Sequence, residues 1–101
     1  MLKVVIRPKA QRDLKEIWSF THKTWSREQA NLYLSTINAA ISELRQKPEL
    51  GRPCDDVSPG LLRRKVERHV IYFRHLQENL LVVRVLHERM QVKAHIANDE
   101  A

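Results

Sequence analysis

The stretch that decides the fold is residues 61–90, LLRRKVERHVIYFRHLQENLLVVRVLHERM. Within it, residues 70–76 and 80–87 are two runs rich in β-branched, aromatic and aliphatic side chains. Gln77, Glu78 and Asn79 join these runs, and a polar connection this short is typical of a β-hairpin loop. The stretch therefore predicts three consecutive β-strands, namely the hairpin and one strand before it.

The last of these strands is apolar on both of its faces. Side chains alternate along a strand, so its residues divide into two sets. One face carries Leu81, Val83, Val85 and His87, and the other carries Leu80, Val82, Arg84 and Leu86. A strand of an antiparallel sheet that is apolar on both faces needs a covering layer on each.

Upstream of that stretch, the sequence first predicts one strand and one helix. Residues 2–6 are a short run rich in valine and isoleucine, too brief for a helix, which indicates a strand. Pro8 ends a strand comfortably and suits the first turn of a helix. Apolar residues then recur at helical spacing from Ala10 to Trp25, with polar residues between them. This pattern predicts a first helix that ends near Thr24.

A second helix is predicted directly after the first. Ser26 and Gln29 have the spacing of a capping box, in which the serine side chain accepts a hydrogen bond from a free backbone N–H. Apolar residues follow at intervals of three or four: Ala30, Tyr33, Leu34, Ile37, Ile41 and Leu44. Pro48 disfavours helical geometry in the residue before it, so the helix should end at Lys47. Because almost no loop separates the two helices, they should form an antiparallel pair over one face of the sheet.

The order strand, helix, helix, three strands predicts an α/β (α+β) two-layer sandwich. In this β-α-α-β-β-β arrangement, a mostly antiparallel sheet carries a helical hairpin on one face, within a single domain of residues 1–101. Residues 48–60 are rich in proline, glycine and aspartate, which predicts a loop in which Leu50 packs back as a plug. Residues 91–98 fit either a short helix or a fifth strand, and the pattern does not decide between them.

The sheet face opposite the helices is expected to stay open, because a chain of this size has little material for a second covering layer. That face would carry apolar positions interrupted by arginines: Val70, Tyr72, Arg74, Val82, Arg84 and Leu86. An apolar surface of this kind on a soluble protein usually marks a protein interaction site. The alternative is that the C-terminal segment folds over it.

The composition is basic, with 18 Lys and Arg against 12 Asp and Glu, and it gives a net charge of +6. Such a charge suggests an acidic partner, either nucleic acid or an acidic protein surface, although solubility alone explains it equally well. No recognisable nucleic-acid motif is present, so sequence-specific binding to nucleic acid is not expected. The run Arg63, Arg64, Lys65 and Arg68 is interpreted as a solvated strand edge that resists aggregation.

Several classes of site are excluded by residue counts and spacing. The single cysteine, Cys54, excludes an internal disulfide and a cysteine metal cluster, and it is expected to be inert. His69 and His75 lie on one strand without a second pair of ligands, so no metal site is expected. The N-terminus lacks the features of a signal peptide, and no apolar run is long enough to span a bilayer, so a cytoplasmic protein without membrane contact is expected.

Three segments carry a resemblance to a known family. The loop segment PELGRP (residues 48–53), the segment LRRKVERHVIYFR (62–74) and above all VRVLHERM (83–90) look like the ParE branch of the RelE/ParE toxin superfamily. The resemblance covers nearly the whole chain, and the HERM tetrad that ends the last strand is its most specific part. The other two segments are looser patterns shared across the superfamily.

The resemblance implies a toxin of a type II toxin–antitoxin module, without a cofactor. It implies that the toxin inhibits DNA gyrase by binding and that a ParD-like antitoxin neutralises it, in a heterotetramer or larger complex. We expect the antitoxin on the open sheet face, where Val82 and Leu86 flank Arg84. An antitoxin segment there would supply apolar residues and at least one carboxylate.

The contact with gyrase is expected at the C-terminal end of the last strand, which should project beyond the helices. This end combines charge with a flexible apolar side chain. Its residues are His87, Glu88, Arg89 and Met90, followed by residues 91–96. Trp25 at the tip of the helical pair is a further candidate contact, although packing in the core or the turn is its favoured role.

The competing interpretation is a ribosome-dependent mRNA endoribonuclease of the RelE type. Such chemistry needs a general base, a general acid and cations for the phosphate, and the candidates are Arg84, His87, Glu88 and Arg89. If the strand continues, His87 and Arg89 point to one side and Glu88 to the other, which is a poor constellation for one site. RelE-type enzymes also tend to carry a late tyrosine, and none follows Tyr72. The sequence therefore favours the non-enzymatic branch.

Overall fold

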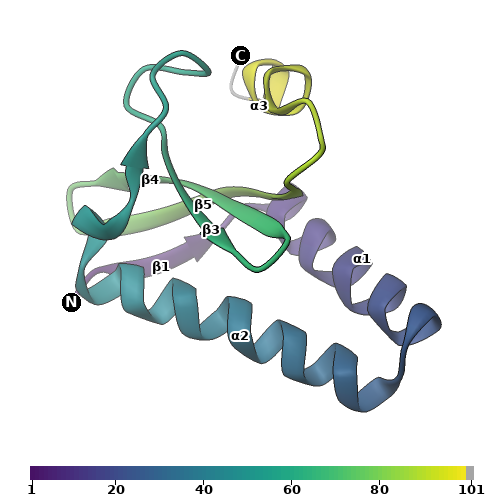
Figure 1. Cartoon of the computed structure of the whole chain (residues 1–101). Coiled ribbons are helices and arrows are strands. Elements are labelled where there is room, and N and C mark those ends of the chain that lie inside the picture. Colours follow the sequence, from purple (N-terminus) through teal and green to yellow (C-terminus); the bar gives the residue numbers. More distant parts are fainter. Residues whose placement is uncertain (100–101) are drawn as a thin grey trace.

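A five-stranded sheet and a pair of antiparallel helices form the main layers of the structure (Figure 1). The structure is a computed structural model that describes the backbone of residues 1–99 and the side chains through residue 96. The elements in chain order are β1 (Lys3–Ile6), α1 (Pro8–Thr24), α2 (Arg27–Gln46), the 3-10 turn η1 (Pro48–Leu50), β2 (Arg52–Pro53), β3 (Leu62–Val66), β4 (His69–Leu76), β5 (Asn79–His87) and α3 (Val92–Asp99). The predicted α+β class and the predicted order of its main elements are confirmed.

The strands are arranged in the order β1-β5-β4-β3-β2. Strand β1 pairs with β5 in parallel, and the remaining pairs are antiparallel. The hairpin of β4 and β5 is therefore the centre of the sheet, as the apolar character of both runs indicates. The two-residue strand β2 was not predicted, because Pro53 and the polar residues around it are typical of a loop.

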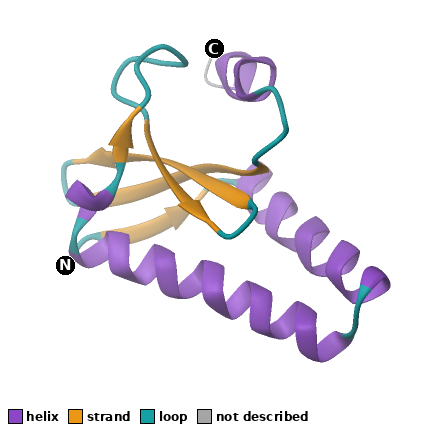
Figure 2. Cartoon of the chain, viewed as in Figure 1, coloured by secondary structure: helices purple, strands orange, loops and turns teal. Residues whose placement is uncertain are grey.

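The helices begin where the local sequence predicts. Pro8 is the first residue of α1, and the Ser26 hydroxyl accepts a hydrogen bond from the Gln29 N–H at 3.0 Å to cap α2. Figure 2 shows both helices on the same side of the sheet. Their buried residues pack with one face of β4 and β5 in a cluster that includes Ile17, Ile37, Ile41, Leu44, Ile71, Phe73, Leu80, Val82 and Val85.

A β-bulge changes the alternation of side chains along β5. Tyr72 pairs with Arg84 and Phe73 pairs with Val82, so Val83 has no partner on β4. Leu80, Val82 and Val85 consequently all pack towards the helices. The prediction that Val82 shares a face with Arg84 and Leu86 is wrong for this reason.

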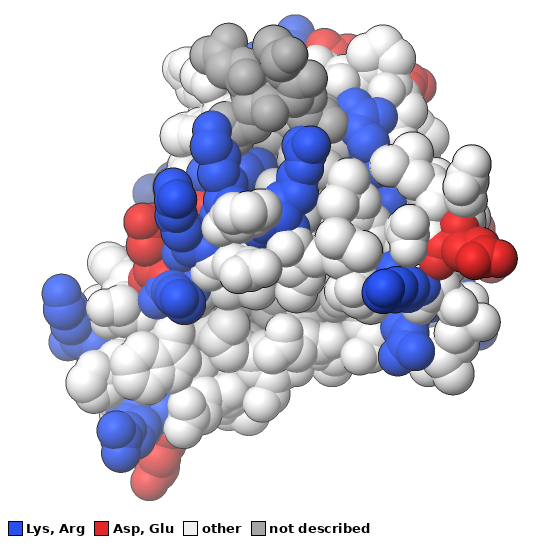
Figure 3. Space-filling view, turned by 180° about the vertical axis from the view of Figure 1, so that it is seen from behind, with Lys and Arg blue, Asp and Glu red and all other residues white. Residues whose placement is uncertain are grey.

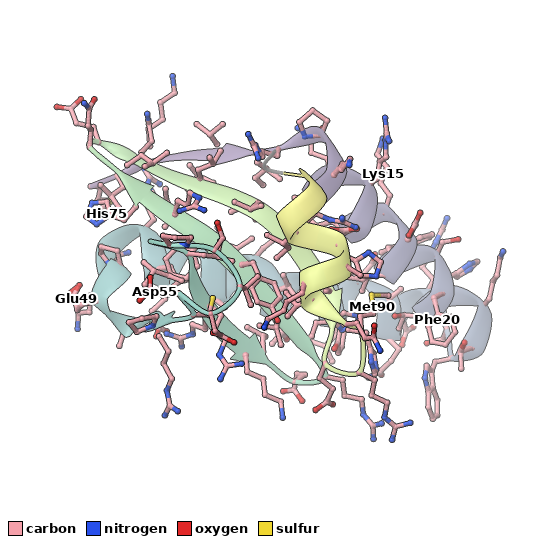
Figure 4. The ribbon with its side chains drawn as sticks, turned by 90° about the horizontal axis from the view of Figure 1, so that it is seen from above. Lys15, Phe20, Glu49, Asp55, His75 and Met90 are labelled. Carbon is pink, nitrogen blue, oxygen red and sulfur yellow. The ribbon has the colours of Figure 1, made fainter. Side chains whose placement is uncertain are left out.

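The second face of the sheet is covered, which corrects the expectation of an open face. Helix α3 and the loop of residues 54–61 lie over it, as Figure 4 shows from above. They form a second buried cluster with the sheet, comprising Cys54, Leu61, Val70, Tyr72, Val83, Leu86 and Ile96. Residues 92–99 are thus helical, and the alternative that the C-terminal segment folds over the sheet is correct.

The segment PELGRP has a different packing role from the one predicted. Leu50 is 41% exposed, so it is not a plug. Instead, the chain passes so close to the sheet at Gly51 that a Cβ atom there would lie 2.3 Å from the Phe73 ring. Glycine is required at position 51 because any larger side chain would collide with the Phe73 ring. Of the helices in the described residues, none has the length and apolar character needed to cross a membrane.

Candidate functional site

The HERM tetrad begins on the last residue of β5 and continues into a tight turn. Strand β5 ends at His87, the Glu88 N–H donates to the Arg68 carbonyl at 2.9 Å, and the Met90 N–H donates to the His87 carbonyl at 3.0 Å. The Arg89 N–H donates to Nδ1 of His87 at 3.2 Å. The strand therefore does not continue through Arg89, and the tetrad is instead a turn fixed by backbone hydrogen bonds.

Tyr33 connects helix α2 to this end of the sheet. Its hydroxyl lies 2.6 Å from Nδ1 of His69 and accepts a hydrogen bond from the Arg68 N–H at 3.2 Å. The His69 ring in turn meets the His87 ring edge-on at a centroid distance of 5.3 Å. Burial, and secondly the charge of His87, lowers the pKa of His69 to about 4. His69 is therefore neutral at neutral pH, and its Nδ1 accepts a hydrogen bond from the Tyr33 hydroxyl, which itself accepts from the Arg68 N–H.

A buried ion pair joins α1 to β5. Asp13 is 7% exposed, and its carboxylate accepts from Arg84 Nε at 2.7 Å and from Arg84 Nη2 at 2.9 Å. It also accepts from the Val85 N–H at 3.0 Å. Strand β1 ends opposite Val82, so the following part of β5 has no strand on that side, and Asp13 supplies the acceptor in its place.

The basic side chains of β3 make ion pairs on the two faces of the sheet. Arg64 pairs with Glu43 of α2 at 2.7 Å, and Lys65 pairs with Glu88 of the tetrad at 3.1 Å. A hydrogen bond from Lys65 is the main cause of the lowered pKa of Glu88. Glu88 is exposed, so this ion pair orients the turn more than it stabilises the fold.

Of the four residues proposed for ribonuclease chemistry, His87, Glu88 and Arg89 share the HERM turn, whereas Arg84 lies apart from Glu88. Arg84 lines a shallow hollow beside the first turns of α1, with Lys9, Arg12, Asp13 and Glu16 among its neighbours. Lys and Arg side chains gather on this side of the molecule in Figure 3. Glu88 lines a different hollow, over β3 and β4. Among the side chains that the structure describes, those of residues 1–96, no three from His, Cys, Asp or Glu are arranged to hold a metal ion.

The protein family of this chain follows from a comparison with known families. Residues 4–92 match the family described as "ParE toxin of type II toxin-antitoxin system, parDE". The chain belongs to the ParE toxin family. The HERM turn, the β4–β5 hairpin and the helical pair all fall inside the matched residues.

Individual relatives agree with this assignment. Toxin ParE1 of Mycobacterium tuberculosis is 38% identical over 89 residues, which cover 87% of this chain and 91% of the relative. Toxin ParE1 of Caulobacter vibrioides is 31% identical over 88 residues, with the same two coverages. Toxin ParE of Escherichia coli is 25% identical over 99 residues, covering 97% of this chain and 96% of the relative.

A solved structure shows that the fold is also that of a ParE system. A chain of the chromosomal ParDE toxin–antitoxin system from P. aeruginosa superposes with a TM-score of 0.76 and 20% sequence identity. The likeness covers 86% of this chain and 96% of that one. At this identity the likeness concerns the fold, and it agrees with the family assignment made from the sequence.

Within this ParE-family fold, the residues predicted to bind the antitoxin are mostly buried. Val70, Tyr72 and Leu86 lie beneath α3 and the loop of residues 54–61. The guanidinium of Arg74 donates to the Pro59 carbonyl and to the Ser58 hydroxyl, each at 2.7 Å, and so fastens that loop. Arg84 is held by Asp13, and Val82 lies on the helix side with no exposed surface.

The residues predicted to contact a target lie on two separate elements. In the HERM turn, Glu88 and Arg89 are exposed and Met90 is 49% exposed, whereas His87 is half-buried. Trp25 is 74% exposed where the two helices join, so the prediction that it packs in the core or the turn is wrong. The tip of the helical pair projects past the sheet in Figure 1.

The sequence analysis did not identify Asp13, and it assigned Tyr33 only to the apolar stripe of the second helix. Asp13 lies in the apolar stripe of α1, three residues after Ala10 and four before Ile17. A carboxylate at such a position is a signal for a buried ion pair, because charged residues are almost never buried unpaired. Tyr33 also falls on an apolar stripe, and its spacing gives no sign of the hydrogen bond to His69.

Proposed function

We propose that this ParE-family toxin inhibits DNA gyrase by binding it and that a ParD-like antitoxin neutralises it. The observation that carries the proposal is the family match over residues 4–92, together with relatives named Toxin ParE1 and Toxin ParE. Gyrase is the target that the resemblance to ParE implies. Binding without catalysis is the mechanism that the arrangement of charged groups supports.

The positions of the charged groups argue against a nuclease. General acid–base chemistry needs groups that reach one reacting phosphate together. Arg84 instead holds Asp13 beside α1, and Glu88 pairs with Lys65 over β3. Two groups that line different hollows and already hold protein partners cannot serve one bond cleavage without rearrangement.

The HERM turn is the surface proposed to contact gyrase. Arg89 and Met90 are exposed side by side in sequence, and the backbone hydrogen bonds of the turn hold them in a defined position. A methionine side chain adapts its shape to a partner surface, and an arginine adds charge and hydrogen-bond donors. Trp25 offers a second, separate aromatic contact at the tip of the helical pair.

The antitoxin is proposed to bind the sheet face that α3 now covers. Val70, Tyr72 and Leu86 form the floor of that face, and Arg84 borders it. An antitoxin segment reaches them only if α3 moves. An eight-residue helix has little stability of its own, so replacing α3 by a segment with similar apolar residues costs little. Such a complex is expected to be a heterotetramer or a larger assembly.

The decisive experiment is DNA supercoiling by purified gyrase with a titration of this protein. We expect loss of supercoiling and accumulation of cleaved DNA, the outcome that the resemblance to ParE implies. The double variant Arg89→Ala, Met90→Ala should lose inhibition, whereas Lys15→Ala on α1 should retain it. Full supercoiling with folded protein at micromolar concentration would defeat the gyrase assignment, and codon-dependent cuts in a translating extract would favour the nuclease.

A further inference from the structure

The HERM turn and the turn that joins β3 to β4 form one hydrogen-bonded unit. Glu67 and Arg68 are the two residues of the β3–β4 turn. The Arg68 carbonyl accepts a hydrogen bond from the Glu88 N–H at 2.9 Å, and the ion pair of Lys65 with Glu88 joins the same two segments. The position of the HERM backbone therefore depends on how the β3–β4 turn is held.

The β3–β4 turn has a strained backbone. The φ angle of Glu67 is 56°, in the left-handed region that favours glycine. Glycine is also the usual residue at the first position of a two-residue hairpin loop with a positive φ there. A residue with a side chain keeps such a conformation only where the surrounding structure fixes it. We therefore looked for contacts to this turn from outside the hairpin.

Tyr33 of α2 makes those contacts. Its hydroxyl accepts from the Arg68 N–H at 3.2 Å and lies 2.6 Å from Nδ1 of His69, to which it donates. Burial raises the pKa of Tyr33, so the hydroxyl keeps the proton that it donates. One hydroxyl thus joins α2 to the last residue of the turn and to the first residue of β4.

A second set of contacts leads from Tyr33 to the HERM turn through two histidine rings. His69 and His87 are directly opposite in the register of β4 and β5, and their rings meet edge-on at 5.3 Å. Nδ1 of His87 accepts from the Arg89 N–H at 3.2 Å. The two sets of contacts therefore end on consecutive residues of the tetrad, namely Glu88 and Arg89.

We propose that Tyr33 is a positioning residue that fixes the shape of the HERM turn and thereby the surface that the target meets. Tyr33 acts through Arg68 and His69, without touching the target itself. It also lies on the helix that begins next to Trp25, so its hydroxyl links the two proposed target contacts in one arrangement. The link to the target rests on the proposed function, whereas the control of the HERM turn does not.

The β4–β5 turn offers a matched comparison within the same sheet. Gln77 has a φ angle of 50°, and it is exposed like Glu67. This turn lies at the opposite end of the hairpin, where the Glu78 carbonyl accepts from the Lys3 N–H at 2.8 Å. Substitution of Gln77 relieves the same kind of strain at a distance from Tyr33.

The first test is amide NMR with hydrogen exchange on Tyr33→Phe, which removes the hydroxyl and keeps the ring. We expect shifted amide signals for residues 68, 69, 88 and 89, and about tenfold faster exchange of the Glu88 amide, the effect of one lost hydrogen bond. The control Ile41→Val weakens the packing of α2 and keeps the hydroxyl, so it should leave these signals in place. Unchanged HERM signals in Tyr33→Phe, or equal changes in both variants, would overturn the proposal.

The second test is rescue by glycine. Glycine adopts a positive φ without strain, so a β3–β4 turn with Glu67→Gly depends less on the hydroxyl. Added to Tyr33→Phe, Glu67→Gly should return the exchange of the Glu88 amide towards the parent rate. Gln77→Gly in the same background should not. Equal rescue by the two glycines, or none by either, would contradict a role of Tyr33 in holding this turn.

The third test measures the consequence for the target by titrating gyrase supercoiling. Tyr33→Phe should need about tenfold more protein for half-maximal inhibition, because fewer molecules hold the binding shape, and the maximal inhibition should be unchanged. Ile41→Val should match the parent. Equal titrations of the parent and Tyr33→Phe would overturn the positioning role at the target. A parent that leaves gyrase uninhibited would instead overturn the proposed function, and the two NMR tests would still decide whether Tyr33 fixes the HERM turn.

Discussion

The two faces of the sheet are both buried, but their covers differ in kind. On one face, α1 and α2 bring regular apolar stripes from helices of 17 and 20 residues. On the other, the cover is an eight-residue helix and an irregular loop. The first cover is joined to the sheet by the Asp13–Arg84 pair and the Tyr33–His69 hydrogen bond as well as by apolar contact.

Because of this difference, the burial of a residue does not show how firmly its covering element is held. A residue can be fully buried beneath an element that detaches at low cost, because local opening exposes it without unfolding the domain. The helix face should therefore open only with global unfolding, whereas the α3 face should open locally. A surface that opens in this way is suited to exchange its own cover for a partner segment.

The largest expected effect on stability comes from alanine substitutions beneath the two covers. Ile37 and Ile96 are a matched pair for this test, because neither side chain has exposed surface. Ile37→Ala on α2 should lower the free energy of unfolding by about 2–5 kcal/mol, the cost of a cavity in a rigid core. Ile96→Ala on α3 should cost about 1 kcal/mol or less, because the loss cannot exceed the free energy that holds α3 in place. Urea denaturation of the two variants measures both values.

Hydrogen exchange supplies the control for this pair of variants. In the parent protein, amides of α3 should exchange faster than those of α2, and Ile96→Ala should accelerate α3 alone. Equal losses of stability for the two alanines would mean that α3 is as firmly held as the helical pair.

The helix-facing half of the fold was predictable because its signals are local. The caps at Pro8 and Ser26 and the spacing of the apolar stripes depend on neighbours in sequence. The covering of the second face was not predictable, because a short segment such as residues 91–98 carries too little periodicity to distinguish helix from strand. The expectation of an open face followed from chain length, and the loop and α3 proved sufficient to cover it.

The candidate site shows the same limit. The HERM tetrad was found from its resemblance, but its geometry was misjudged because the strand ends at His87. The bulge at Val83 depends on pairing between β4 and β5, and nothing in the run VVRVLH distinguishes it from regular alternation. Contacts between distant residues, such as Asp13 with Arg84, require the folded structure.

Asp13→Ala should have the next largest effect, and it tests whether the ion pair holds the helix face. The variant removes the carboxylate that Arg84 and the Val85 N–H share, so the free energy of unfolding should fall by about 3 kcal/mol. Glu16→Ala removes an exposed carboxylate of the same helix and should change stability by less than about 0.5 kcal/mol. Thermal or urea unfolding measures the two changes. Similar values would show that the Asp13–Arg84 pair adds no more to the free energy of unfolding than an exposed carboxylate does.

The last expected effect is a pH dependence of the free energy of unfolding that arises at His69, the residue that Tyr33 contacts. In the folded protein the pKa of His69 is lowered to about 4 by burial and by the charge of His87, from an ordinary value of 6.5. Between these values the unfolded chain binds the proton more strongly, so this contribution is complete above about pH 6.5 and is lost as the pH falls towards 4. Glu88 and Asp13 oppose the shift because their charges favour the protonated ring.

The variant His69→Gln isolates that contribution. It cannot gain a proton, so its free energy of unfolding should decline less than that of the parent between pH 6.5 and pH 4. The exposed His75 on the same strand provides the matched control, His75→Gln, for loss of a histidine as such. Urea denaturation across this range gives the difference, and parallel profiles for the parent and His69→Gln would show that His69 titrates alike in both states. A steeper decline in the parent would instead establish that the folded state favours neutral His69.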